Sequence, residues 1–291
     1  MKWFVFVQKI NQTLVERSLV FERQSLLVAI SGGQDSSCLL QALRTLCPLW
    51  EWNLAVIYCD HAWFELKSKS YSKTSQLACY SQIKYYQSIA PSRAFSETKS
   101  RAWRYESFVR VGKAHNYFQI ITGHTATDRA ETLLYTMLRG SSQRGLQSLS
   151  WQRKLSFGIS LVRPLLTITR SQFTLMCKKE KFCVVLDPSN QRCEWHRNRI
   201  RRRLLPYLRY YFNPRVDQLM CQLAELAHGE ACYLTGLSKT LELTVSIKNL
   251  MCLPVSLQRR LIYSFFHYGQ VKQTFLYIEF VRCLLFHIAL F

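Results

Sequence analysis

Short apolar runs alternate along most of the chain with segments in which apolar residues have helical spacing. The apolar runs have the length of buried strands and lie at 26–30, 54–58, 83–86, 118–121 and 183–186. The helical segments lie at 36–46, 66–82, 101–115 and 127–139. Such alternation is typical of a parallel sheet covered by helices on both faces. The pattern therefore predicts an α/β fold with a Rossmann-like parallel sheet.

The pattern changes after residue 215. Apolar residues recur with helical spacing between 219 and 227, and the alternation of strands and helices stops. The change predicts an α/β domain over 1–215 and a small, mainly helical domain over 216–291. The apolar end at 281–291 is too short to span a membrane and contains Arg282, so we interpret it as a buried helix or strand.

The charge of the chain indicates a polyanionic partner. Lysine and arginine total 39 against 18 acidic residues, which gives a formal net charge of +21. This surplus favours nucleic acid, because basic side chains replace the counterions condensed on a phosphate backbone. A generic basic surface is the alternative. None of the eleven cysteines forms a C-x-x-C pair, so we expect reduced thiols rather than a zinc ribbon or a thioredoxin-like site.

The most informative motif is Ser31-Gly32-Gly33-Gln34-Asp35-Ser36, between the first predicted strand and the first predicted helix. Glycines let backbone amides approach an anion closely, and a helix N-terminus adds free N–H groups. Ser31 and Ser36 add hydroxyl donors, whereas the Asp35 carboxylate suits a phosphate only where Mg²⁺ bridges the two. A simple capped turn is the alternative. The context of strand, loop and helix favours a site for the pyrophosphate of ATP.

Two further polar clusters follow predicted strands, at the edge where parallel sheets bind ligands. They are Asp60-His61 and Gly123-His124. Asp128 and Glu131 then share one face of the next predicted helix, with spacing i and i+3. Two carboxylates there can hold a lysine ammonium, accept its proton or bind Mg²⁺. Alternatively, they only complement the helix dipole.

An arginine-rich segment occupies 197–203. Arg197 and Arg201 have the spacing i and i+4, as do Arg199 and Arg203. One pair can face a ligand while the other meets a phosphate backbone, and a solvated basic helix face is the alternative. The aromatic residues that flank this segment, which can also be core residues, are Trp195, Tyr207, Tyr210, Tyr211 and Phe212.

The glycine loop resembles the PP-loop of the ATP pyrophosphatase superfamily, whose members cleave ATP between the α- and β-phosphates. The later motifs make residues 25–210 similar to the tRNA(Ile)-lysidine synthetase family. Asp60-His61 and Ala102-Trp103-Arg104-Tyr105 fit the same pattern. The remaining motifs are G-H-x-x-x-D-x-x-E-T from Gly123, R-G at 139–140, G-L at 145–146, R-P-L-L at 163–166, D-P-S-N at 187–190 and R-N-R-I-R at 197–201.

The resemblance implies an ATP-dependent ligase. In this family ATP adenylates the C2 oxygen of the wobble cytidine in the CAU anticodon of tRNA(Ile). The ε-amine of L-lysine then displaces AMP and forms lysidine, so that the tRNA reads AUA instead of AUG and carries isoleucine instead of methionine.

The resemblance also implies roles for individual residues. Asp35, Asp128 and Glu131 are the expected catalytic residues, with Asp35 also expected at Mg²⁺. The expected contacts to ATP are Ser31, Gly32, Gly33, Gln34, Asp35, Ser36, His61, Gly123 and His124. The expected contacts to lysine or tRNA are Arg104, Arg139, Arg197 and Arg201. The family further suggests a homodimer and tRNA contacts from the small helical domain.

Two other functions are compatible with the loop. One is another PP-loop tRNA-modifying enzyme such as a thiolase, which the missing C-x-x-C pair opposes. The other is a non-catalytic tRNA-binding relative, which the intact loop opposes.

The chain start resembles neither a signal peptide nor a transit peptide, because Gln8 and Lys9 interrupt the apolar residues at 1–7. A short, very basic member of the family without a presequence resembles one that is encoded in a plastid genome and acts in the stroma. The resemblance therefore implies the plastid stroma and no membrane anchor, with the bacterial cytoplasm as the alternative.

Overall fold

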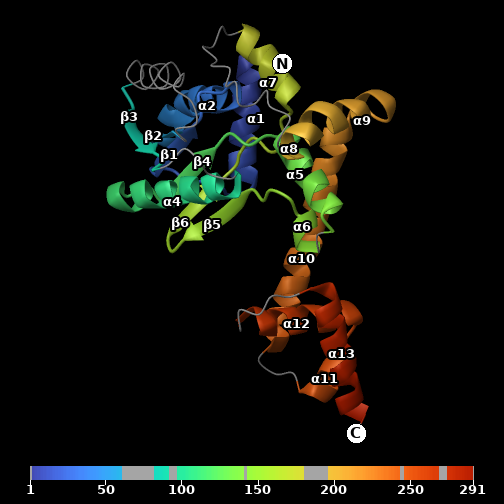
Figure 1. The fold of residues 1–291 in the computed structure, drawn as a ribbon. Helices are drawn as coiled ribbons and strands as arrows, with labels where there is room; N and C mark the ends of the chain where they lie inside the picture. The colour runs from blue at the N-terminus through green and yellow to red at the C-terminus, as the bar shows by residue number, and fades with distance from the viewer. Residues whose placement is uncertain are drawn as a thin grey trace. The chain divides into compact units, whose positions relative to one another are not determined.

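A computed structural model describes residues 2–60, 82–91, 97–140, 143–179, 196–242, 246–268 and 274–290. Almost all of the predicted helix at 66–82, the predicted strand at 183–186, the D-P-S-N motif and His61 lie outside the described residues. The chain folds as two compact units, Met1–Ala224 and Glu225–Phe291. Their boundary falls within the long helix α10 (Val216–Glu242), shown in Figure 1.

The first unit is built on a six-stranded sheet with the order β3-β2-β1-β4-β6-β5. The strands are β1 (Ser25–Ile30), β2 (Asn53–Asp60), β3 (Lys84–Ile89), β4 (Gln119–Thr122), β5 (Gln152–Ser156) and β6 (Ile159–Val162). All neighbouring strands pair in parallel except β5 and β6, which are antiparallel. The predicted α/β fold with a mostly parallel sheet is confirmed.

The central strand β1 is buried on both faces, as an uninterrupted apolar run requires. Leu26, Leu27 and Val28 are fully buried. The parallel register pairs Ile30 with Tyr58 of β2 and Ala29 with Thr122 of β4. The carboxyl ends of these three strands therefore meet at one edge of the sheet, where the polar clusters begin.

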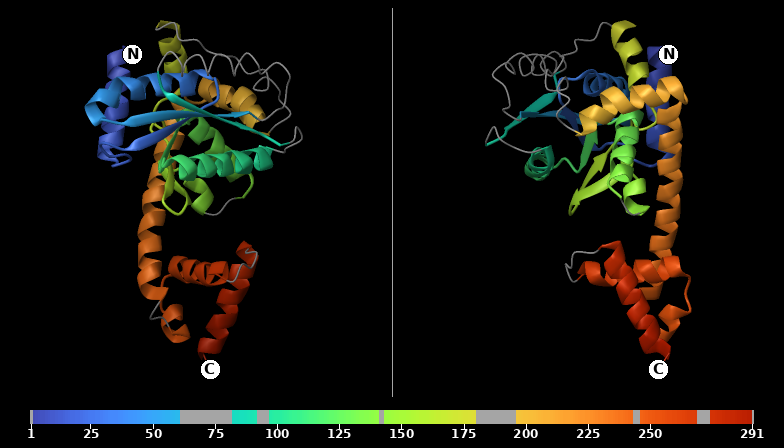
Figure 2. Two further views of the ribbon diagram at one scale, coloured as in Figure 1. Left: turned by 90° about the vertical axis from the view of Figure 1, so that its left-hand side faces the viewer. Right: turned by 45° about the vertical axis from the view of Figure 1, so that its right-hand side comes forward.

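Two separate clusters of apolar side chains cover the two faces of this sheet. On one face, α1 (Trp3–Glu16) and α2 (Gln34–Trp50) pack against Leu26 and Val28 of β1. On the other face, Phe108 of α4 (Glu97–His115) packs with Leu27 of β1. Figure 2 shows α2 and α4 on opposite sides of the strands. The two faces use alternate residues of β1, in keeping with the period of two along a strand.

The sequence patterns did not predict α1, β5, β6 or α7 (Arg170–Lys179). β5 is an edge strand whose first three residues are exposed, so it lacks the apolar run of a central strand. β6 contains only four residues. The helix predicted to end near Pro48 continues to Trp50, because a proline in the last turn removes one helical hydrogen bond without ending the helix.

The second unit is helical throughout its described residues, as predicted. After α10 it contains α11 (Ile247–Met251), α12 (Val255–Tyr268) and α13 (Phe275–Leu290), around a core that includes Leu250, Leu261 and Ile262. The expectation that the segment 281–291 is buried is wrong for much of its described part, since Leu284, Phe286 and Ile288 are 49%, 47% and 54% exposed. Among the described residues, no helix is long and apolar enough to cross a bilayer.

The packing of α2 predicts the stability of the first unit. Leu43 is fully buried and Leu49 of the same helix is 67% exposed. Leu43→Ala should lower the free energy of unfolding by about 2–5 kcal/mol, because a cavity replaces packed atoms. Leu49→Ala should stay within about 0.5 kcal/mol of the wild type. Denaturant titration followed by tryptophan fluorescence measures this, since every tryptophan lies in the first unit. Equal effects of the two variants would contradict the packing described for α2.

Candidate active site

A cavity of about 320 Å³ lies at the carboxyl ends of β1, β2 and β4. Its wall combines the glycine loop, the end of β2, the loop from β4 to α5 (Ala126–Leu138), one side of α4 and the start of α7. Open parallel sheets bind ligands at this place, because the loops that leave neighbouring strands diverge there. The predicted residues that line the cavity are Ser31, Gly33, Asp35, Ser36, Arg104, Gly123, His124 and Asp128.

The glycine loop is closed by its own serine hydroxyls. The Ser31 amide donates to Ser36 Oγ at 3.3 Å, and Ser36 Oγ donates to the carbonyl of Gly33 at 3.0 Å. Gly32 has φ 79°, a left-handed conformation that favours glycine. Helix α2 then starts at Gln34, after an N-cap glycine that has no side chain. The amides of the first turn of α2 therefore face the cavity as donors for an anion.

A second loop passes directly against this one. A Cβ atom added to Gly123 would lie 3.1 Å from both the amide nitrogen and the Cα of Ser36. Few real Cβ atoms make so close a contact, so a side chain at this position would require the neighbouring backbone to move by a few tenths of an ångström. Gly123 thus brings the loop after β4 into contact with the start of α2.

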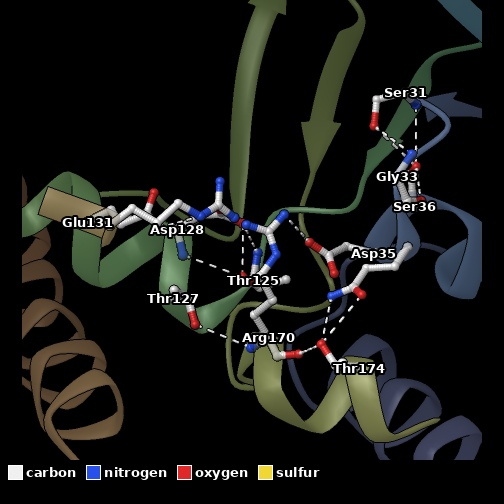
Figure 3. Close-up of polar contacts among 12 residues, drawn as sticks. Ser31, Gly33, Asp35, Ser36, Thr125, Thr127, Asp128, Glu131, Arg170 and Thr174 are labelled. Atoms are coloured by element: carbon white, nitrogen blue, oxygen red, sulfur yellow. Dashed lines mark hydrogen bonds and ion pairs between the residues drawn. The ribbon is translucent and has the colours of Figure 1, made fainter. Parts of the chain in front are cut away.

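Asp35 is buried beneath the cavity and pairs with an arginine of α7. Arg170 Nη2 lies 2.8 Å from Asp35 Oδ2, while Asp35 Oδ1 is buried without a hydrogen-bond partner among the described residues. Burial raises the pKa of Asp35 to about 6; Arg170 opposes this rise and the Asp128 carboxylate adds to it. Figure 3 shows Arg170 between Asp35 and the start of α5.

His124 stands at the cavity wall as a neutral imidazole. Its Nδ1 lies 2.9 Å from Thr122 Oγ1. Burial and, next, the positive charge of Arg163 lower the pKa of His124 to about 3. At physiological pH this ring therefore offers a hydrogen bond and no charge.

Asp128 both caps the start of α5 and lines the cavity. Its Oδ2 accepts hydrogen bonds from the amide of Thr125 at 2.8 Å and from Thr125 Oγ1 at 2.9 Å, which completes a capping box at the start of α5. Asp128 also lines the cavity. The cap fixes the orientation of a carboxylate that faces the ligand space.

Glu131 does not line the cavity, although it lies one turn after Asp128. Its Oε1 is 3.2 Å from Arg201 Nε. Burial, followed by the charge of Asp128, raises the pKa of Glu131 to about 8. Figure 3 shows Glu131 on the side of Asp128 that is remote from Asp35.

The four predicted arginines lie in different surroundings. Arg104 reaches the cavity from α4. Arg201 contacts Glu131, and the guanidinium of Arg197 lies 5.7 Å from the centre of the Tyr135 ring. Arg139 is exposed and donates to the Tyr135 hydroxyl at 2.7 Å.

The side chain of Gln34, which was expected to contact ATP, points toward α7 instead. It donates to Thr174 Oγ1 of α7 at 3.1 Å, so it joins the glycine loop to that helix. Gln34 and Gly32 are not among the residues that form the cavity wall.

Sequence reasoning missed Arg170. It belongs to no charge run, and its position in the site depends on the packing of α7 against α2. One local contact fixes it further, because its amide donates to Thr127 Oγ1 at 3.2 Å. The only signal along the sequence was its place shortly after R-P-L-L, where the chain leaves β6.

Residues 4–208 match the PP-loop domain family, so the first unit has the fold of that family. A U34-tRNA thiolase from Methanococcus maripaludis shares this fold, with a TM-score of 0.64, 14% identity, and coverage of 76% of this chain and 77% of the thiolase.

Comparison with curated sequences gives a narrower assignment. The chain is 41% identical to a tRNA(Ile)-lysidine synthase from Nostoc sp., over 83% of this chain and 71% of the relative. It is 38% identical to one from Synechocystis sp., over 91% and 84%. It is 34% identical to a chloroplastic one from Zygnema circumcarinatum, over 94% and 78%. The chain therefore belongs to the tRNA(Ile)-lysidine synthase family.

The close contact at Gly123 gives a test of the site. Gly123→Ala should weaken ATP binding by about fivefold or more, because the new methyl group must push the two loops apart at a cost of about 1–3 kcal/mol. Gly229→Ala is the matched control, since nothing lies within 4 Å of a Cβ atom there. Isothermal titration calorimetry with ATP measures both variants. Full affinity in Gly123→Ala would show that the loop contact does not shape the ATP site.

Proposed function

We propose that this chain uses ATP to ligate L-lysine to C2 of the wobble cytidine in the CAU anticodon of tRNA(Ile). The observation that carries the proposal is that one cavity joins an anion-binding glycine loop to a fixed carboxylate, Asp128. The loop suits the phosphates of ATP and the carboxylate suits an amine. The reaction needs both, since the cytidine oxygen is first adenylated with release of pyrophosphate and the amine then displaces AMP.

At the phosphate end, three kinds of donor converge. They are the amides that start α2, the hydroxyl of Ser31 and the guanidinium of Arg170, while the Ser36 hydroxyl donates to the Gly33 carbonyl and holds the loop closed. These donors can bind the negative charge that develops on the leaving pyrophosphate. Donors that are already fixed in position lower the activation barrier of the adenylation step most effectively. Arg170, which contacts Asp35, also lines the cavity and can therefore bind the pyrophosphate.

The residues present also fit Mg²⁺. The Oδ1 atom of Asp35 is a buried carboxylate oxygen without a partner among the described residues, as a cation ligand would be. No cluster of three or more potential metal ligands occurs within the described ranges. This suits an ion that is held by one or two carboxylates and by substrate phosphates. Asp35 would hold the ion, which when bound would neutralise charge on the phosphates.

At the amine end, Asp128 is the carboxylate in the cavity. The ε-amine of lysine has a pKa of ~10.4 in water, so a neighbouring group must take its proton before attack. We assign this contact to Asp128. Glu131, which lies outside the cavity wall and contacts Arg201, acts as a positioning residue for that arginine.

The tRNA is the polyanion that the net charge of +21 favours. We assign phosphate or base contacts to Arg104, Arg139 and Arg197, and further contacts to the helical second unit. A homodimer, which the family resemblance suggested, stays a prediction. We propose the plastid stroma as the location because chloroplastic relatives are similar over most of the chain, and cyanobacterial relatives keep the bacterial cytoplasm as the alternative.

A thiolase activity is less well supported. The similarity to the U34-tRNA thiolase is a similarity of fold at 14% identity. That relative has a [4Fe-4S] cluster, whereas this sequence has no C-x-x-C pair and no metal-binding cluster within its described residues.

Transfer of radiolabelled lysine to a tRNA(Ile) transcript with a CAU anticodon tests the proposal. Transfer should require ATP and Mg²⁺. Asp128→Asn should raise the KM for lysine about tenfold or more and leave the KM for ATP nearly unchanged, because a hydrogen bond to a charged group is worth about 1.5–3 kcal/mol. The exposed Glu106→Gln on α4 is the control. No transfer with the wild type would refute the proposal, and an unaltered KM for lysine in Asp128→Asn would refute the role of Asp128.

The pair of Asp35 and Arg170 predicts a pH dependence. Arg170 holds the pKa of Asp35 down, so Arg170→Gln should raise it further above about 6. Less Asp35 is then ionised near neutral pH, and the acidic limb of kcat/KM for pyrophosphate release should move to higher pH. Arg170→Lys keeps the positive charge, so it should move the acidic limb much less. If the limb stays in place in Arg170→Gln, Arg170 does not govern the charge of Asp35.

A further inference from the structure

A second hollow, of about 870 Å³, lies on the surface of the first unit away from the cavity. It is formed by the end of α5 and by three consecutive helical segments, α8 (His196–Arg199), η3 (Ile200–Leu204) and α9 (Leu205–Tyr211). Figure 1 shows α8 beside α5. We call this hollow the α5–α9 groove.

The wall of the α5–α9 groove combines basic and aromatic side chains with the aliphatic side chains of Leu138, Ile200 and Leu204. Arg139, Arg199 and Arg203 line it together with the rings of Tyr135 and Tyr207, and the described wall contains no carboxylate. Arg199 and Arg203 therefore share one surface, as their spacing predicted. Arg201 points instead to Glu131. The groove offers positive charge and ring faces to the same ligand.

Exposed aromatic rings continue from the groove along α9. Tyr207, Tyr210, Tyr211 and Phe212 are 52%, 81%, 66% and 71% exposed, so the interpretation of these four as core residues is wrong. The ring centroid of Tyr211 lies 4.6 Å from that of Tyr207 and 4.7 Å from that of Tyr210. Exposed rings of this kind are unfavourably solvated in the free protein. Their free energy falls when they stack against another flat group.

Helix α5 connects the active-site cavity to the α5–α9 groove. Asp128 lines the cavity and Tyr135 lines the groove, and at the rise of an α-helix these seven residues span about 10 Å. Between these two ends of α5, the guanidinium of Arg197 lies over the Tyr135 ring and its charge acts on Glu131. A short run of nucleotides can therefore occupy the groove while a neighbouring base is in the cavity.

We propose that the α5–α9 groove and the exposed rings of α9 bind unpaired bases of the same RNA loop that delivers its base to the cavity. The bases stack on the tyrosines while Arg139, Arg199 and Arg203 neutralise the backbone that joins them. This inference rests on the proposed function for the identity of the RNA. It adds a binding site for its single-stranded part.

The chemistry of the groove favours single-stranded RNA over a duplex or a protein. A duplex keeps its bases stacked on each other, so phosphate contacts bind it and exposed tyrosines add little. Unpaired bases offer π-faces that stack on aromatic side chains whatever the sequence. A protein partner for three arginines needs acidic side chains and gains no specific benefit from a row of exposed rings.

Binding of RNA to the full-length protein tests the inference without ATP or lysine. The probes are a fluorescent hairpin with a CAU-containing loop and a fully paired duplex of equal length. The double variant Tyr210→Ala, Tyr211→Ala should bind the hairpin at least about fivefold more weakly, since stacking is worth about 1–3 kcal/mol per base. Its affinity for the duplex should change by less than about twofold, within the range of a surface substitution.

Two controls separate stacking from folding and from charge. Tyr210→Phe with Tyr211→Phe keeps the rings and should bind the hairpin like the wild type. Phe157→Ala removes a ring that is fully exposed at the turn from β5 to β6 and should have no effect. Arg203→Ala should reduce the slope of log affinity against log salt by about one, because one phosphate contact is lost. The tyrosine variants should leave that slope unchanged.

The results of these binding experiments distinguish unpaired RNA from a duplex and from a second copy of the chain as the ligand of this surface. Loss of hairpin binding alone, restored in the phenylalanine variant, supports the inference. Equal loss for hairpin and duplex, or no loss, overturns it. A changed oligomeric state with unchanged RNA binding also overturns it, in favour of self-association. Lysine transfer is a separate assay, so a chain that binds the hairpin through its tyrosines but transfers no lysine keeps this inference and loses the proposed function.

Discussion

The contact between the glycine loop and the loop after β4 is the constraint on which the site depends. The parallel register of β1, β2 and β4 ends three strands at one edge, but it does not bring two loops within atomic contact. Gly123 does so, because its missing side chain lets that loop meet the backbone of Ser36. Helices α2 and α5 then both begin at the same cavity, one beside Asp35 and the other beside Asp128. The glycine loop and Asp128 are neighbours for this reason.

Burial sets the charges around that contact. Asp35 and Glu131 are both buried, and the pKa of each is raised, to about 6 and about 8. An arginine stands against each carboxylate, Arg170 at the first and Arg201 at the second. The low dielectric of the interior makes each pair sensitive to the arrival of another charge. The entry of a phosphate, a cation or an ammonium into the cavity therefore changes the pKa values that these carboxylates have in the free protein.

The arginines of the α5–α9 groove differ from those at the buried carboxylates. The groove arginines are exposed and lie beside aromatic rings. Exposed pairs of opposite charge contribute little in water, whereas a surplus of one sign attracts a polyanion over a distance. The chain thus combines a buried site in which carboxylates face arginines with a net positive charge of +21 over the whole sequence. Helix α5 joins the two, with Asp128 at its start and Arg139 just beyond its end.

The sequence by itself determined the α/β fold, the strands that form the centre of the sheet, the glycine loop and the helical character of the C-terminal part. These features depend on local periodicity and on the special backbone freedom of glycine, which a sequence shows directly. Only the tertiary structure decided that Asp128 faces the cavity while Glu131 turns to Arg201, that Gln34 binds Thr174, and that Arg170 completes the site. It also decided that the tyrosines of α9 are exposed. These outcomes depend on which elements pack side by side, and no spacing along the chain contains that information.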